Sequence, residues 1–123
     1  MATRKEIGAW GEGIAAKHLE GKGYAVRDRN WRAGHGELDI IAERASEIIF
    51  VEVRTRTSDA FGKPEESITP RKRAKLISTA EAYLDAHALL DVQWQIDVIV
   101  IDLDARNAVT RLDHIECAIG RND

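Results

Sequence analysis

Two apolar segments of this chain carry acidic side chains in their interiors. Residues 36–41 read Gly-Glu-Leu-Asp-Ile-Ile, and residues 48–54 read Ile-Ile-Phe-Val-Glu-Val-Arg after a short polar interruption. Such β-branched runs favour strands, and their spacing predicts a β-hairpin that brings Asp39 near Glu52. Burying an unpaired carboxylate is costly unless a partner, a proton or a metal neutralises it. Both acids are therefore functional candidates.

The chemistry of this carboxylate pair depends on what neutralises it. If Asp39 lies beside Glu52, either one carboxylate holds a proton or a cation sits between them. Two carboxylates with a backbone carbonyl and water suit Mg²⁺ or Mn²⁺, which promote phosphodiester hydrolysis. Arg54 shares a strand face with Glu52 and would stabilise the developing negative charge. A salt-bridged hairpin on a half-exposed sheet fits the spacing equally well.

Hydrophobic periodicity predicts helices and strands over the rest of the chain. The 123 residues suit one domain, spanning 1–123. Thr69 followed by Pro70 is typical of a helix start, because threonine caps a helix and proline is tolerated in its first turn. The element order predicts the α/β class, with a mixed sheet covered by helices. The expected helices span 4–19 and 70 to 87 or 90, and the expected strands span 24–31, 37–43, 47–55, 92–103 and 109–116, with a loop over 57–69.

The net charge of −3 conceals a local excess of positive charge between the middle of the chain and residue 75. Such a cluster binds phosphates through charge and counterion release even when the whole protein is acidic. A merely solvated basic face is the alternative. The residues that we expect to bind nucleic acid are Arg56, Arg71, Lys72, Arg73 and Lys75.

Other features limit the class of protein. No segment approaches the ~20 apolar residues of a membrane span, and the N-terminus lacks the apolar run of a secretory signal, so we expect a cytoplasmic protein with no membrane partner. Cys117 is the only cysteine, which excludes an internal disulfide and a cysteine-rich zinc site. We expect Cys117 to be a small buried hydrophobe and Asp97 to pair with a basic neighbour. Trp10 and Trp94 are expected in the core.

A longer pattern of motifs runs through about residues 8–116. These motifs are Gly11-Glu12-Gly13, Asn30-Trp31-Arg32, the segments 36–41 and 50–56, Gly62-Lys63-Pro64-Glu65-Glu66, Thr69-Pro70-Arg71-Lys72 and Asp97-Val98. In this pattern the chain resembles the YraN family of endonuclease-like proteins. More broadly it is similar to the PD-(D/E)xK nucleases, especially the archaeal Holliday junction resolvases.

The resemblance implies a restriction-endonuclease-like fold, in which helices flank a mixed central β-sheet. It implies a site for Mg²⁺ or Mn²⁺ in which Asp39 and Glu52 are metal ligands and Val53 lends its backbone carbonyl. Glu12 would reach the same site from the first helix. The implied partner is DNA, including branched DNA. Junction resolvases of this fold work as dimers, so the resemblance leaves a homodimer open.

Arg54 stands where the wider superfamily has lysine. Arginine stays protonated and is a poor general base, although it keeps the charge that binds phosphate. Proton abstraction would then fall to metal-bound hydroxide. Two functions remain open. The first is a metal-dependent DNA endonuclease that hydrolyses phosphodiester bonds, with Glu12, Asp39, Glu52 and Arg54 as catalytic residues. The second is a nuclease-fold module that binds nucleic acid or a partner with weak catalysis or none.

Overall fold

A computed structural model describes residues 3–34, 36–57 and 68–119. Its elements follow the predicted order of helix, three strands, helix and two strands, and their ends coincide with the expected ones or lie within four residues of them. Most of the predicted loop over 57–69, including the motif at residues 62–66, lies outside the described residues. The elements are α1 (Arg4–Gly21), β1 (Ala25–Ala33), β2 (Gly36–Arg44), β3 (Glu47–Thr57), α2 (Pro70–Ala86), β4 (Trp94–Leu103) and β5 (Val109–Ile119).

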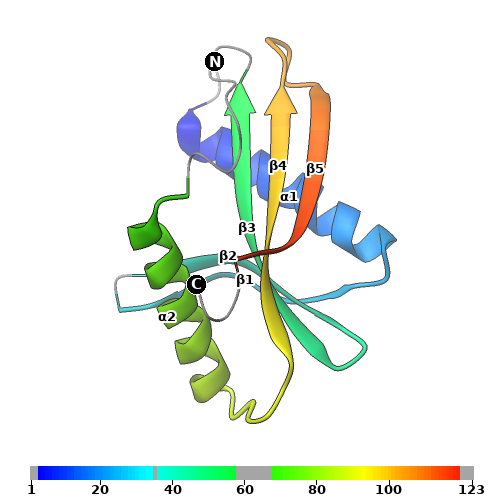
Figure 1. Ribbon diagram of the computed structural model, residues 1–123. Helices are drawn as coiled ribbons and strands as arrows, with labels where there is room; N and C mark the ends of the chain where they lie inside the picture. The colour runs from blue at the N-terminus through cyan, green and yellow to red at the C-terminus, as the bar shows by residue number, and fades with distance from the viewer. Residues whose placement is uncertain (1–2, 35, 58–67, 120–123) are drawn as a thin grey trace.

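The strands form one mixed sheet in the order β1-β2-β3-β4-β5 (Figure 1). All neighbours are antiparallel except β3 and β4, which are parallel. A parallel pair needs a long crossover connection, and α2 supplies it. The α/β class with a mixed sheet and flanking helices is therefore confirmed, and it is consistent with a nuclease-like fold.

Both helices begin at threonine caps. The Thr3 side chain accepts a hydrogen bond from the Glu6 N–H, and the Glu6 carboxylate accepts one from the Thr3 N–H, which completes a capping box. Thr69 accepts from the Lys72 N–H at 3.2 Å, with Pro70 in the first turn. The caps fix where each helix starts and hence which residues of the first turns lie near the sheet.

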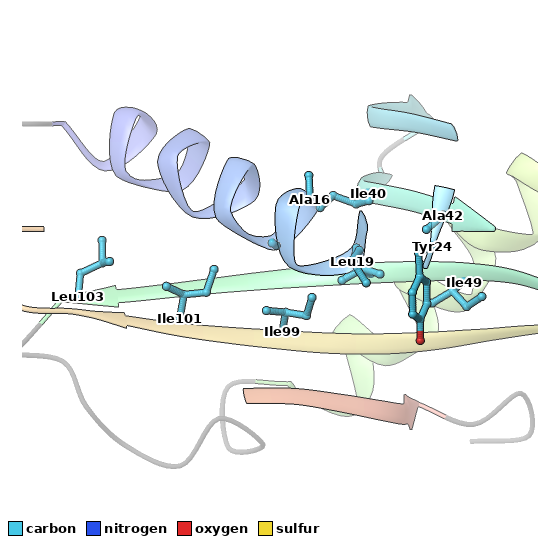
Figure 2. Packing of buried hydrophobic residues seen from close by; sticks show 11 residues of the cluster. Ala16, Leu19, Tyr24, Ile40, Ala42, Ile49, Ile99, Ile101 and Leu103 are labelled. Carbon is cyan, nitrogen blue, oxygen red and sulfur yellow. The ribbon is translucent and has the colours of Figure 1, made fainter. Parts of the chain in front are cut away.

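The helices cover opposite faces of the sheet and bury two separate apolar clusters (Figure 1). Figure 2 shows the first cluster, where Ala16 and Leu19 of α1 lie over a row of isoleucine and leucine side chains on β4. In the second cluster, Tyr83 of α2 packs edge-on against Phe50 of β3. Neither helix among the described residues is long and apolar enough to span a membrane.

Two expectations about individual side chains were wrong. Trp10 is 57% exposed, because it lies about 140° around α1 from Ala15, which faces the sheet. Cys117 is also exposed, since β5 bulges between the pairs that join it to Ile96 and Val98, and Cys117 adopts a φ of 52° there. Trp94 packs against the second apolar cluster, as expected.

Candidate active site

The hairpin of β2 and β3 brings the two candidate acids together. Its backbone register runs from the pair Arg44–Glu47 to the pair Ile40–Val51, so Asp39 and Glu52 come next. At this point a side chain replaces the backbone as hydrogen-bond acceptor. The Asp39 Oδ2 accepts a hydrogen bond from the Val53 N–H at 2.8 Å. The acids therefore lie where regular pairing of the two strands gives way to side-chain contacts.

Burial and the neighbouring Glu52 carboxyl group favour the protonated form of Asp39 by raising its pKa. Burial raises the pKa of Asp39 to about 8, with further increases from a hydrogen bond to Glu52 and from the Glu52 charge. The Val53 N–H and the Arg54 charge act in the opposite direction. At neutral pH the Asp39 carboxyl is therefore mostly protonated, as expected when two like charges meet in a buried place with no cation.

Arg54 lies beside the Asp39–Glu52 pair but is too far from Glu52 for a hydrogen bond. Its Nη2 is 3.8 Å from the Glu52 Oε2, which is an ion-pair distance and too long for a hydrogen bond. The side chains of Arg54 and Glu52 are only 23% and 20% exposed. The Arg54 Nε is buried and has no hydrogen-bond partner among the described residues. The guanidinium thus keeps a free donor beside the acids, which suits an anionic ligand.

Helix α1 brings Glu12 to the same place by a close approach to β3. A Cβ on Gly11 would overlap the Oγ1 of Thr55, so only glycine allows this helix to lie so near the strand. Burial raises the pKa of Glu12, and the charge of Asp39 raises it further, whereas Arg29 lowers it. Because the charge of Asp39 affects the pKa of Glu12, the two side chains belong to one electrostatic site.

Asn30 is a part of this site that sequence reasoning missed. It lies on β1 between the pairs Arg29–Ile40 and Trp31–Leu38, with a φ of 53°. In the amide orientation that satisfies its neighbours, its nitrogen donates to Glu12 Oε1 at 2.9 Å and to Glu37 Oε1 at 3.3 Å. The available signal was an asparagine inside a strand, since asparagine is depleted in strands but tolerates the left-handed conformation.

The four residues predicted to be catalytic line a single hollow of about 500 Å³ on the α1 side of β3. Arg4 of the first helical turn and Val53, Thr55, Arg56 and Thr57 of β3 also border it. Glu12, Asp39, Glu52 and Arg54 are thus brought together from three elements. This hollow is the candidate active site.

The predicted basic residues divide into three groups. Lys72 and Lys75 of α2 line a neighbouring hollow of about 330 Å³, which also borders Glu52 and Arg54. Arg71 is exposed and Arg73 is half-buried on the same helix, and neither borders these two hollows. Arg56 reaches the candidate active site but makes two short contacts to the buried Asp102, of 2.7 and 3.0 Å.

Arg56 therefore has a structural partner that its sequence context did not reveal. A bidentate pair with a buried carboxylate holds the guanidinium in place, because separating them would leave the buried Asp102 charge with only the longer contact to Arg111, at 3.9 Å. Asp97 is equally buried, and it pairs with His114 at 2.8 Å, as expected for a basic neighbour. Asp97 does not border the candidate active site.

The oxygen donors of the site fit a hard divalent cation in chemistry, although they form a partial set. Asp39, Glu52 and the Val53 carbonyl would supply oxygen ligands of the kind that Mg²⁺ and Mn²⁺ take. Among residues 3–34, 36–57 and 68–119, no three carboxylate, histidine or cysteine side chains converge closely enough to hold a metal ion by themselves. Mg²⁺ usually keeps several coordinated waters, so a site with few protein ligands suits this ion.

These features define a class of small α/β protein, with a half-buried carboxylate pair and an arginine at the centre of a mixed sheet. The model of a family described as uncharacterised protein family UPF0102 matches residues 11–101. The chain belongs to this family, which is the YraN family predicted from its motifs.

Relatives from distant bacteria match nearly the whole chain. The UPF0102 protein of Roseiflexus castenholzii is 43% identical over 117 residues, which is 94% of each chain. That of Dehalococcoides mccartyi is 40% identical over 118 residues, or 96% of each chain. Among solved structures, SfsA of Pyrococcus furiosus in complex with Ca²⁺ matches at 17% identity and a TM-score of 0.42. The match covers 85% of this chain and 62% of the SfsA chain, so this chain spans about three fifths of that protein.

Proposed function

We propose that this protein is a metal-dependent DNA endonuclease that hydrolyses phosphodiester bonds. The observation that carries the proposal is the placing of Asp39 and Glu52 together in one hollow with Glu12 and Arg54, where the raised pKa of Asp39 marks a proton that a divalent cation would replace. Asp39, Glu52 and the carbonyl of Val53 would hold Mg²⁺ or Mn²⁺. When bound, the ion would polarise a phosphoryl oxygen and lower the pKa of a coordinated water.

The chain's own residues would divide the remaining tasks. Arg54 would donate hydrogen bonds from its guanidinium group to the non-bridging phosphate oxygens, which stabilises the charge that develops as the water attacks phosphorus. Arg54 cannot accept the water's proton, because a guanidinium stays protonated. Glu12, with its raised pKa and its hydrogen bond from Asn30, would receive that proton.

The positive charges of α2 support DNA as the substrate. Lys72 and Lys75 border the hollow next to the candidate active site, at the end of the helix whose backbone N–H groups favour phosphate. A preference for branched DNA and assembly as a homodimer stay predictions from the resemblance.

One observation favours a second function, a nuclease-fold module that binds nucleic acid or a partner without turnover. The proton on Asp39 at pH 7 relieves the repulsion between Asp39 and Glu52 without any metal, so a protein that only binds its ligand needs no cation at this site. Arg54 in place of lysine also removes a general base. The two functions differ in whether metal and both acids are needed for a chemical step.

Cleavage of supercoiled plasmid and of a synthetic four-way junction, each with Mg²⁺ or Mn²⁺, tests the proposal. We expect cleavage by the natural protein, no cleavage in EDTA, and at least a hundredfold loss in Asp39→Asn and Glu52→Gln. The matched control is Asp85→Asn, an exposed carboxylate on α2 away from the site, which should cleave normally. Salt-dependent binding without cleavage of either DNA, unchanged in Asp39→Asn, would establish the second function instead.

A further inference from the structure

Three hollows on the surface adjoin one another through shared lining residues. The candidate active site and the hollow bordered by Lys72 share Glu52 and Arg54 as common walls. That second hollow shares Gly36, Lys75 and Thr79 with a third one, of about 480 Å³. We call this row of three adjoining hollows the strand track.

Carboxylates become fewer along the strand track. The candidate active site holds Glu12, Asp39 and Glu52 beside Arg4, Arg54 and Arg56, and the middle hollow holds Glu37 and Glu52 beside Arg54, Lys72 and Lys75. The third hollow has Lys75 and no carboxylate among its described lining residues. A phosphate chain therefore meets less repulsion when it extends from the candidate active site in the direction of α2.

The third hollow is lined by small side chains. Apart from Lys75, its described lining consists of Ala33, Gly34, Gly36, Ser78, Thr79 and Ala82. A Cβ on Gly36 would overlap the Oγ1 of Thr79, so this glycine allows β2 to approach α2 and forms the border between the middle and third hollows. Small residues leave room for a sugar and a base without specifying which base.

The shape of the strand track favours one strand over a duplex. Its first hollow is bordered by α1 and the other two by α2, and these helices lie on opposite faces of the sheet (Figure 1). The hollows meet at Glu52 and Arg54, just beyond the last backbone pair of β2 and β3. A ligand that fills the strand track must turn from one face to the other, which a flexible single strand can do and a stiff duplex of persistence length about 50 nm cannot.

We propose that the strand track holds one unpaired nucleic-acid strand, with the phosphate to be cleaved at Asp39 and Glu52, the next phosphate at Lys72 and Lys75, and the following nucleotide in the third hollow. The proposal rests on the proposed function for its first position only. No aromatic side chain is among the described lining residues, so binding depends on phosphates and not on base stacking. The substrate class is a single-stranded segment or a strand displaced from a duplex, bound without sequence preference.

Equilibrium binding in EDTA tests the proposal separately from catalysis. We expect the oligonucleotide (dT)6 to bind at least tenfold more tightly than (dT)2, by competition in a fluorescence anisotropy assay, because only the longer strand reaches the third hollow. Ser78→Trp fills that hollow from an exposed position and should weaken (dT)6 at least fivefold while (dT)2 is unchanged. Ala74→Trp, at an exposed position of α2 outside the strand track, should leave both affinities unchanged.

Equal affinity for (dT)2 and (dT)6, full (dT)6 affinity in Ser78→Trp, or tighter binding of a blunt duplex than of (dT)6 would each overturn the proposal. If Ser78→Trp fails to fold, Ser78→Glu places a repelling carboxylate at the same exposed position and gives the same test. Absence of cleavage with every metal would refute the proposed function, and the length dependence in EDTA would remain as evidence for the strand track.

Discussion

At the scale of single residues, the proton on Asp39 links the site to the stability of the fold. Asp39 has a pKa of about 8 in the folded protein and about 3.9 in an unfolded chain. Below pH 4 its carboxyl is protonated in both states, and the raised pKa has no effect on stability. As the pH rises from 4 to 8, the unfolded chain releases a proton that the folded protein keeps, so the free energy of unfolding falls and then levels off above pH 8.

Asp39→Asn should remove this pH dependence. The amide keeps an acceptor for the Val53 N–H and a donor toward Glu52, without a titrating proton. We expect the free energy of unfolding of the variant, relative to that of the natural protein, to increase by an amount on the order of 3 kcal/mol between pH 5 and pH 8. Urea unfolding in EDTA measures it, with Asp85→Asn as the control. Parallel pH profiles for Asp39→Asn and the natural protein would refute the raised pKa of Asp39.

Arg54 should matter for turnover and little for folding. Its contact with Glu52 is long, so Arg54→Ala should change the free energy of unfolding by less than about 1 kcal/mol. The loss of a donor to the phosphate should lower the cleavage rate constant about 100-fold. Arg54→Lys keeps the charge and should retain cleavage. Single-turnover kinetics provide the measurement, with the exposed Arg106→Ala as a neutral control, and an Arg54→Ala variant as fast as the natural protein would exclude this role.

At the scale of secondary structure, the distance between α1 and β3 decides whether Glu12 reaches the acids. The Gly11 contact with Thr55 sets that distance. The same helix contains Gly13, where an added Cβ would meet nothing within 4 Å. Alanine substitutions at the two glycines therefore separate the effect of helix propensity from the effect of moving the helix.

Gly11→Ala should destabilise the protein by about 1–3 kcal/mol, because the helix or strand must shift to relieve the overlap. It should also slow cleavage, since Glu12 moves with the helix. Gly13→Ala should instead stabilise the protein by about 0.5–1 kcal/mol and leave cleavage unchanged. Thermal unfolding and cleavage rates together measure both effects. Equal behaviour of the two variants would show that the close approach has no role.

Elements that depend on local pattern were predictable from the sequence, whereas contacts between distant elements were not. Apolar, β-branched runs separated by a short polar interruption located β2 and β3, and their antiparallel register placed Asp39 beside Glu52. The engagement of Arg56 by Asp102 requires the parallel pairing of β3 with β4, which no local pattern specifies. Asn30 was missed because its role depends on an irregular backbone conformation in β1.

At the scale of the whole molecule, the sheet separates two surfaces that meet at one point. Glu12 and α1 lie toward one face, the lysines of α2 lie toward the other, and Glu52 with Arg54 borders the hollows of both. An overall charge of −3 is compatible with binding a polyanion because basic side chains gather around these hollows. The same arrangement would place the proposed cation between the carboxylates and the phosphates of the proposed substrate.

The central claim is that a divalent cation replaces the proton that Asp39 holds beside Glu52. Titration calorimetry with Mn²⁺ at pH 7, in two buffers that differ in ionisation enthalpy, counts the protons released per bound ion. We predict one Mn²⁺ site that releases close to one proton in the natural protein and is lost in Asp39→Asn, with normal binding in Asp85→Asn. Absence of Mn²⁺ binding, or binding that releases no proton and persists in Asp39→Asn, would contradict the claim.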